Sequence, residues 1–169
     1  RETVPQAGRI AMLAPDDANA RPQVLEVRTA AQQLGVELFV VEVRRGDYDR
    51  AFSDIMAADA GAWFVAGHTM FCRDRKAIVA LAAQYKIPAI YERPDQVQDG
   101  GLMAYGPNRA ALYRRIASYI DRILKGARAG DLPVEQPTRF ELVVNLRTAS
   151  ALGIRIPQTV LVRADEVIR

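Results

Sequence analysis

The sequence predicts an α/β domain built on a doubly wound parallel sheet. Short and almost continuously apolar segments at 9–14, 36–43, 62–66 and 87–91 have the length and composition of buried strands. Segments in which apolar residues recur with the helical period separate them, at 22–34, 48–58 and 73–85. Strands that alternate with helices in this way form a parallel sheet with helices on its faces.

The rest of the chain extends this unit. We expect a short strand at 102–105 and a helix that starts at Pro107 and runs to about Lys125. A polar connector, a strand at 140–145 and a short helix at 146–152 complete the predicted regular structure. The long helix carries an apolar stripe of Leu112, Ile116, Tyr119, Ile120, Ile123 and Leu124. We divide the chain into an α/β lobe, 1–106, and a segment that completes the fold, 107–169.

Composition and charge exclude several classes of protein. Hydrophobic residues make up 50% of the chain and charged residues 25%, as in an ordinary globular domain. The net charge is only +3, and no aromatic residues interleave with the densest basic cluster, Arg73, Arg75 and Lys76, so we expect no binding of nucleic acid. Cys72 is the only cysteine and His68 the only histidine, which is too few ligands for a zinc site.

Motifs for nucleotide binding and catalysis are absent from the sequence. Neither GxGxxG nor GxxxxGK[ST] occurs, so we expect no nucleotide cofactor. Asp16 and Asp17 follow the first strand as in a receiver domain, but the third strand ends at His68 without a phosphoacceptor aspartate. A Cys72–His68 dyad would lack the orienting acid that a nucleophile needs. We therefore expect no catalytic residues and no bound metal.

The topology places a ligand at the carboxyl ends of the strands. Tyr91, Glu92 and Tyr105 follow or end predicted strands, where an aromatic ring can stack on a flat ligand and a carboxylate can meet an ammonium group. Two groups of candidate residues have a structural alternative to ligand binding. Asp17 or Asn19 is suited to cap the helix that follows the first loop. Tyr105 is suited to the core, with its hydroxyl at the surface.

Long stretches of the chain resemble one protein family. The segment 131–153 has an unusual order of turn, strand and short helix, and the chain closes with Ala164-Asp165-Glu166-Val167-Ile168. Together with 86–91, 100–107 and 123–127, these segments resemble the C-terminal half of ABC-transporter substrate-binding proteins related to tryptophan and tyrosine importers.

The resemblance implies a Rossmann-like lobe of a type I periplasmic-binding fold, without catalysis or cofactor. Members of this family close two lobes on a small ligand and deliver it to the membrane permease of an ABC importer. The implied location is the periplasm, or another site outside the cytoplasm with a membrane tether. The positions of this sequence that match the ligand-binding loops of the family are Asp16, Asn19, His68, Thr69, Tyr91, Glu92, Tyr105, Gly106 and Asn108.

Two positions depart from the family pattern. His68 stands where the family usually has an aspartate, and Asn108 lies near the place of another aspartate in relatives that bind aromatic amino acids. Both missing acids could hold an α-ammonium group. Glu92 could substitute for them, while an aromatic acid or another ligand without an ammonium group is the alternative.

The same resemblance predicts how the long helix is used. In the two-lobe fold this helix packs on the N-terminal lobe, so its stripe from Leu112 to Leu124 is expected to be exposed in this chain. Exposed apolar area favours a partner, and we expect a homodimer through this helix. The alternative function is an effector-sensing regulatory domain of the related repressor type. An enzyme has no support beyond fold analogy.

Overall fold

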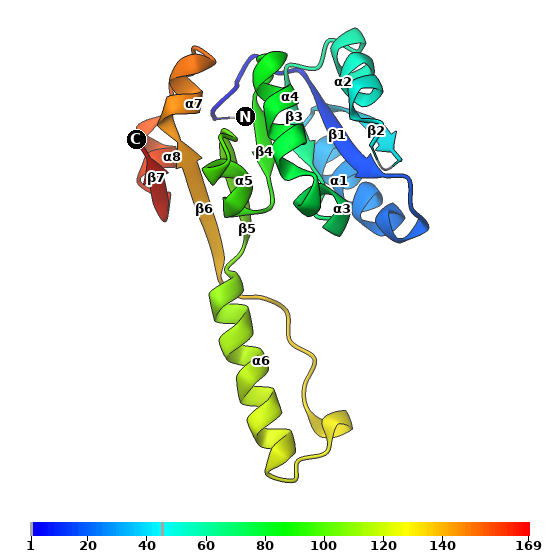
Figure 1. The fold of residues 1–169 in the computed structure, drawn as a ribbon, viewed down its shortest axis with the longest axis vertical. Coiled ribbons are helices and arrows are strands. Elements are labelled where there is room, and N and C mark those ends of the chain that lie inside the picture. The colour runs from blue at the N-terminus through cyan, green and yellow to red at the C-terminus, as the bar shows by residue number, and fades with distance from the viewer. Residues whose placement is uncertain (1, 45) are drawn as a thin grey trace.

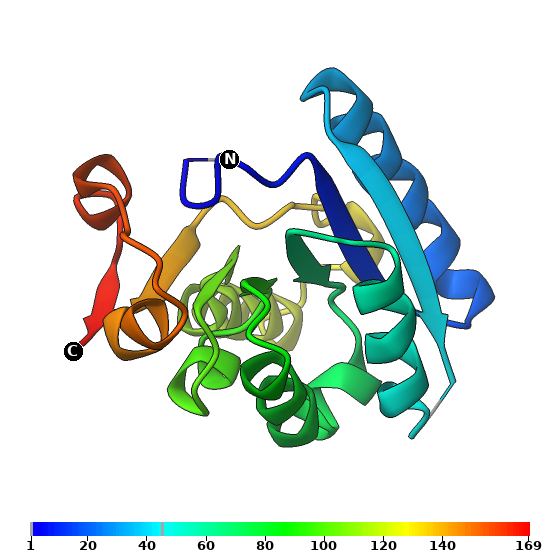
Figure 2. The ribbon, with the colours of Figure 1, turned by 90° about the horizontal axis from the view of Figure 1, so that it is seen from above.

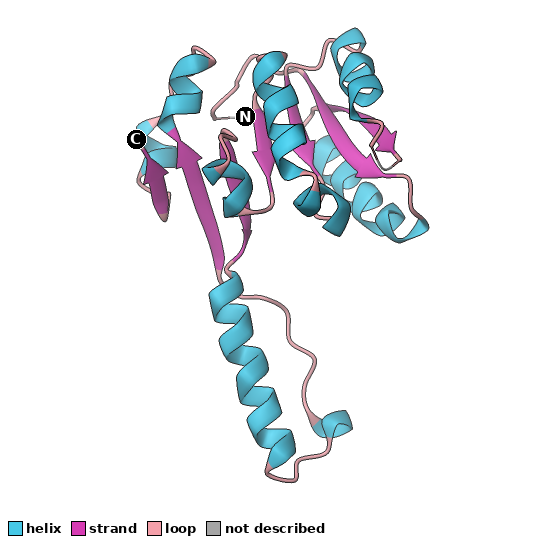
Figure 3. Cartoon of the chain, viewed as in Figure 1, coloured by secondary structure: helices cyan, strands magenta, loops and turns pink. Residues whose placement is uncertain are grey.

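The computed structural model describes residues 2–44 and 46–169, whose strands form one seven-stranded sheet (Figures 1 and 3). The sheet order is β2-β1-β3-β4-β5-β6-β7. Strands β5 and β6 are antiparallel, and all other neighbours are parallel. The strands are β1 (Arg9–Pro15), β2 (Glu37–Val43), β3 (Ala62–Val65), β4 (Ala89–Tyr91), β5 (Met103–Pro107), β6 (Phe140–Asn145) and β7 (Glu166–Ile168).

Helices cover the two faces of this sheet unequally. In Figure 2, α1 lies beside β1 and β2 on one face, whereas α2, α4 and α5 lie on the other. The doubly wound α/β prediction is therefore confirmed. The helices are η1 (Ala18–Ala20), α1 (Arg21–Gln33), α2 (Tyr48–Ala57), α3 (Thr69–Arg73), α4 (Arg75–Gln84), α5 (Pro94–Gln98), α6 (Arg109–Leu124), η2 (Ala129–Asp131), α7 (Leu146–Ala151) and α8 (Gln158–Leu161). No helix within the described residues is long and apolar enough to cross a membrane.

The structure corrects several predicted elements. The helix expected at 73–85 is α4, and a short helix that was not predicted, α3, precedes it and meets it at Asp74. The His68 side chain caps α3 directly after β3, so a helix begins earlier than expected. The elements α5, α8 and β7 were not predicted, because segments of three to five residues are too short to display a period. The division at residue 106 stays a prediction, and β6 and β7 belong to the same sheet as β1 to β5.

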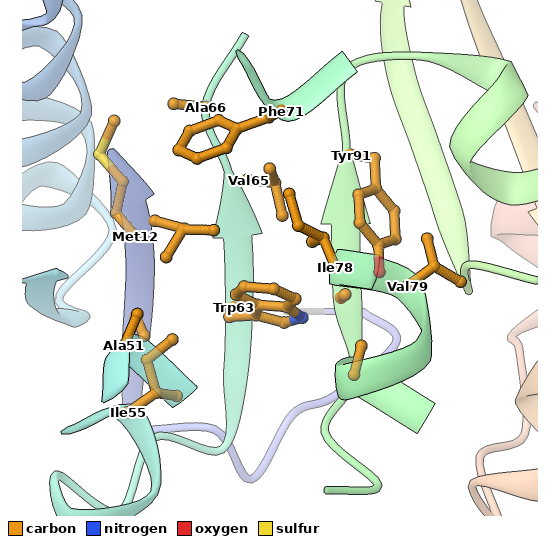
Figure 4. Packing of buried hydrophobic residues seen from close by; sticks show 14 of the residues in the cluster. Met12, Ala51, Ile55, Trp63, Val65, Ala66, Phe71, Ile78, Val79 and Tyr91 are labelled. Carbon is orange, nitrogen blue, oxygen red and sulfur yellow. The ribbon is translucent and has the colours of Figure 1, made fainter. Parts of the chain in front are cut away.

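The main core lies between the sheet and the helices α2 and α4, which cover one of its faces (Figure 4). Trp63 of β3 is at its centre. Its ring packs edge-on against Phe52, with centroids 4.6 Å apart, and against Tyr91, with centroids 6.3 Å apart. A second cluster around Val144 and Val160 closes the other end of the sheet. These contacts hold the strands in the register that brings their carboxyl ends together.

Helix α6 and the returning segment 125–139 form an arm, which leaves the sheet at the end of β5 and returns to it at the start of β6 (Figure 1). Asn108 fixes its base, because its side chain accepts the Ala111 N–H at 2.8 Å and donates to Glu141 Oε2 at 2.7 Å. Farther along, the Tyr119 hydroxyl donates to the Pro133 carbonyl at 2.7 Å. No residue of α6 is buried.

Gly101 makes the packing of Tyr91 testable. A Cβ atom at this position would lie 2.7 Å from the Gln96 carbonyl oxygen and 2.6 Å from the Tyr91 ring. We expect Gly101→Ala to lower the free energy of unfolding by about 1–3 kcal/mol, the usual cost of overpacking, in urea denaturation followed by circular dichroism. Gly130→Ala is the control, because nothing lies within 4 Å of its added Cβ. Equal stability of the two variants would contradict this account.

Candidate functional site

The carboxyl ends of β1, β3, β4 and β5 meet at the edge of the sheet from which α6 leaves (Figure 1). Asp17 follows β1, His68 follows β3, Glu92 follows β4 and Asn108 follows β5. Parallel strands place these four positions at the same edge although they are far apart in the sequence. This edge is the candidate ligand-binding surface.

Glu92 lies at the middle of this edge, between two glycines. A Cβ atom on Gly67 would lie 1.9 Å from Glu92 Oε2, and one on Gly106 would lie 2.1 Å from the Glu92 carbonyl oxygen. The glycines therefore provide the space that this residue occupies. Its side chain is half-buried and has no hydrogen bond or ion pair with another described residue. The result is a carboxylate available to a ligand.

His68 and Asp17 lie side by side at the ends of neighbouring strands. His68 Nδ1 accepts the Met70 N–H at 3.3 Å, which leaves Nε2 directed to Asp17 Oδ2 at 3.9 Å. Asp17 in turn accepts the backbone N–H and the side-chain amide of Asn19, both at 2.9 Å. Asp17 thus acts as the helix cap that the sequence offered as an alternative, and it also supplies a second carboxylate beside the imidazole.

An ion pair and a thiol lie next to Glu92. Arg93 donates to both carboxylate oxygens of Asp95, at 3.0 and 2.6 Å. This hydrogen bonding lowers the pKa of Asp95 and raises that of Arg93. Burial raises the pKa of the Cys72 thiol, more than nearby Arg93 lowers it. Because the thiolate is the reactive form, Cys72 has the environment of an unreactive cysteine.

Three predicted site residues lie away from this surface. Tyr91 is fully buried in the core, and burial raises the pKa of its hydroxyl. Tyr105 lies on the face of the sheet opposite to Tyr91, where its ring stacks on that of Phe140 with centroids 5.5 Å apart. Asp16 is exposed and bonded to Arg44 Nε at 2.7 Å. Neighbouring residues of a strand point to opposite faces, so a position near a strand end does not determine the direction of a side chain.

The other predicted residues are at the edge, in different roles. Asn19 is bonded to Asp17, Thr69 is the exposed first residue of α3, and Gly106 makes room for Glu92. The amide of Asn108 is committed to the base of the arm. The sequence analysis did not select Gly67 or Asp17 as site residues. Gly67 could have been found as a glycine directly after a buried strand, and Asp17 as a carboxylate at the end of the adjacent strand.

The arrangement suits recognition better than covalent chemistry. Two carboxylates, of Asp17 and Glu92, and one imidazole, of His68, lie at this edge of the sheet. Within residues 2–44 and 46–169, no group of three or more His, Cys, Asp or Glu side chains is placed to hold a metal ion. No serine or cysteine is hydrogen-bonded to His68 in the part of the chain that the structure describes.

Comparison with known proteins gives both structural relatives and a family. A domain from Streptococcus pneumoniae, described as an ABC domain in complex with L-Trp, is 25% identical with a TM-score of 0.90, over 99% of this chain and 57% of that one. A conserved domain protein from Vibrio cholerae is 24% identical with a TM-score of 0.89, over 98% and 56%. A ligand-free, open substrate-binding protein with adhesive properties from Clostridium difficile is 20% identical with a TM-score of 0.73, over 98% and 56%.

The chain thus spans a little over half the length of each of these solved structures. No curated protein matches it. The model of a family described as ABC transporter substrate binding protein matches residues 1–168. This match confirms the resemblance that the sequence segments indicated. The family is one of substrate-binding proteins rather than of enzymes, and this chain belongs to it.

Proposed function

We propose that this chain is a ligand-binding lobe of the solute-binding component of an ABC importer. Outside the cytoplasm, the strand-end surface captures a small metabolite and a second lobe closes over it. The closed complex then delivers the metabolite to a membrane permease. Membership of the substrate-binding family supports this role. A ligand held between two lobes stabilises their closed arrangement, so one lobe alone holds it weakly.

One observation supports the binding site, namely the carboxylate of Glu92 between Gly67 and Gly106. A half-buried charge without a partner is unfavourable, and a positively charged group of a ligand would offset that cost with a charge-assisted hydrogen bond. Asp17 and His68, at the ends of the adjacent strands, would meet further polar groups. The proposed ligand is a small metabolite with an ammonium group, and an aromatic amino acid is the first candidate. The relative solved in complex with L-Trp supports that choice.

The role of Glu92 is testable with two ligands that differ in one group. Glu92→Gln removes the charge and keeps the size of the side chain. We expect it to weaken binding of L-tryptophan about tenfold, because a hydrogen bond to a charged group contributes about 1.5–3 kcal/mol and this one is partly solvated. Binding of indole-3-propionate, which has the ring and carboxylate but no ammonium group, should be unchanged. NMR titration of the 169-residue chain measures both affinities.

Glu26→Gln is the matched control, since it removes a carboxylate from the exposed surface of α1. If the wild-type chain binds indole-3-propionate as tightly as L-tryptophan, recognition of an ammonium group is wrong and a ligand without that group is favoured. If neither compound nor any other aromatic amino acid shifts the resonances of residues 66–69 and 92, the aromatic ligand is wrong.

Gly67 tests whether the space for the carboxylate matters. The three atoms nearest to the added Cβ of Gly67→Ala are side-chain atoms of Glu92, which can rotate away. We therefore expect the free energy of unfolding to change by less than about 0.5 kcal/mol, as at an ordinary surface site, while the affinity for L-tryptophan falls as in Glu92→Gln. Differential scanning fluorimetry and the same titration measure the two quantities.

The control for this substitution is Gly8→Ala, where nothing lies within 4 Å of the added Cβ. Because both substitutions act through one carboxylate, the double variant Gly67→Ala/Glu92→Gln should bind no more weakly than Glu92→Gln alone. Additive losses would show that Gly67 affects binding by another route.

A further inference from the structure

His68 and Asp17 are each held by one side-chain atom and present another at the carboxyl edge of the sheet. In His68, Nδ1 accepts the Met70 N–H at 3.3 Å, and the ring packs edge-on against the buried ring of Phe71, with centroids 6.1 Å apart. In Asp17, Oδ1 accepts the backbone N–H and the side-chain amide of Asn19, both at 2.9 Å. The remaining atoms, Nε2 of His68 and Oδ2 of Asp17, face each other at 3.9 Å.

The hydrogen bond from Met70 determines which ring nitrogen of His68 carries the proton. A nitrogen that accepts a hydrogen bond has no proton of its own, so in the neutral imidazole the proton is on Nε2. A charged imidazole would also carry a proton on Nδ1, directed at the Met70 N–H, and would lose this bond. The geometry is therefore that of a neutral donor, Nε2–H, beside a charged acceptor, Asp17 Oδ2.

The spacing of these two atoms leaves room for one atom between them. A hydrogen bond between nitrogen and oxygen is at most about 3.2 Å long, so 3.9 Å is too long for a direct one. An oxygen atom about 2.8 Å from both would form an angle of about 90° between its two bonds, which the broad range of hydrogen-bond directions at oxygen allows. The two side chains are 32% and 37% exposed, so a ligand can reach them from the solvent.

The polarity of the pair selects one chemical group for that place. The oxygen of a hydroxyl group can accept from the His68 Nε2–H and donate its own proton to Asp17 Oδ2. A carboxylate only accepts, and it would lie beside the negative charge of Asp17. An ammonium group only donates, and it would face the Nε2–H. Of these three groups, only the hydroxyl satisfies both atoms.

We propose that the ligand carries a hydroxyl group, which His68 and Asp17 bind between them. This inference rests on the proposed function and specifies the ligand of the same site. The pair is close to the Glu92 carboxylate, because His68 follows Gly67, whose added Cβ would lie 1.9 Å from Glu92 Oε2. One small molecule therefore contacts Glu92 through its ammonium group and the pair through its hydroxyl group. An analogue without the hydroxyl group leaves a donor and an acceptor without partners, and it binds more weakly.

Three amino acids that differ in one hydroxyl group test the proposal. L-Phenylalanine has none, L-tyrosine has one on the ring, and L-threo-3-phenylserine has one on the carbon next to the α-carbon. In NMR titrations of the 169-residue chain, we expect one hydroxylated compound to bind at least about tenfold more tightly than L-phenylalanine. Its identity shows whether the hydroxyl group belongs to the ring or to the chain of the ligand.

The titrations separate failure of this inference from failure of the proposed function. If L-phenylalanine binds and neither hydroxylated compound binds more tightly, the hydroxyl group is wrong, a water molecule serves the pair instead, and the proposed function stands. If none of the three compounds and no other aromatic amino acid binds, the aromatic ligand is wrong and this inference is overturned with it.

Two conservative substitutions show whether the pair causes the preference. His68→Asn removes the Nε2–H and keeps a side-chain acceptor for the Met70 N–H, since asparagine caps helices well. Asp17→Asn keeps one oxygen for Asn19 and replaces the other with a donor. Each should bring the ratio of the two dissociation constants, for L-phenylalanine and the hydroxylated compound, close to one. Glu92→Gln is the matched control, because it weakens both compounds and preserves the ratio.

Differential scanning fluorimetry verifies that each variant is folded. A folded His68→Asn or Asp17→Asn variant that keeps the wild-type ratio would overturn the proposal.

The protonation of His68 can be measured without a ligand, because it is the only histidine of the chain. Long-range ¹H–¹⁵N NMR spectra at about pH 8, where an ordinary imidazole is neutral, should show a proton on Nε2 and none on Nδ1. A proton on Nδ1 would overturn the proposal, since Nε2 would then be an acceptor facing the carboxylate of Asp17.

Discussion

The parallel pairing of β1, β3, β4 and β5 determines where the other features of this molecule lie. The core around Trp63 buries one of their faces, and their parallel direction brings their carboxyl ends to one edge. Glu92 lies at that edge because it follows β4, and α6 projects from it because it follows β5. The candidate site and the arm are thus consequences of one ladder of backbone hydrogen bonds.

Sequence patterns predicted the features that extend over many residues. The strand around Met12 and the helix α6 span seven and 16 residues, which is long enough for a recognisable apolar pattern, and the structure confirms them. The elements α5 and β7 span five and three residues, so they form only where the rest of the domain packs on them. Their existence depends on tertiary contacts that no local pattern contains.

Side-chain direction explains why the site was only partly predictable. Tyr91 and Glu92 are adjacent at the end of β4, but the register with β3 turns Tyr91 toward Trp63 and leaves Glu92 at the edge. Glycine is needed at positions 67 and 106 because atoms of Glu92, which follows the neighbouring strand β4, occupy the space that a Cβ atom would take. A single strand does not specify which residues its neighbours will approach.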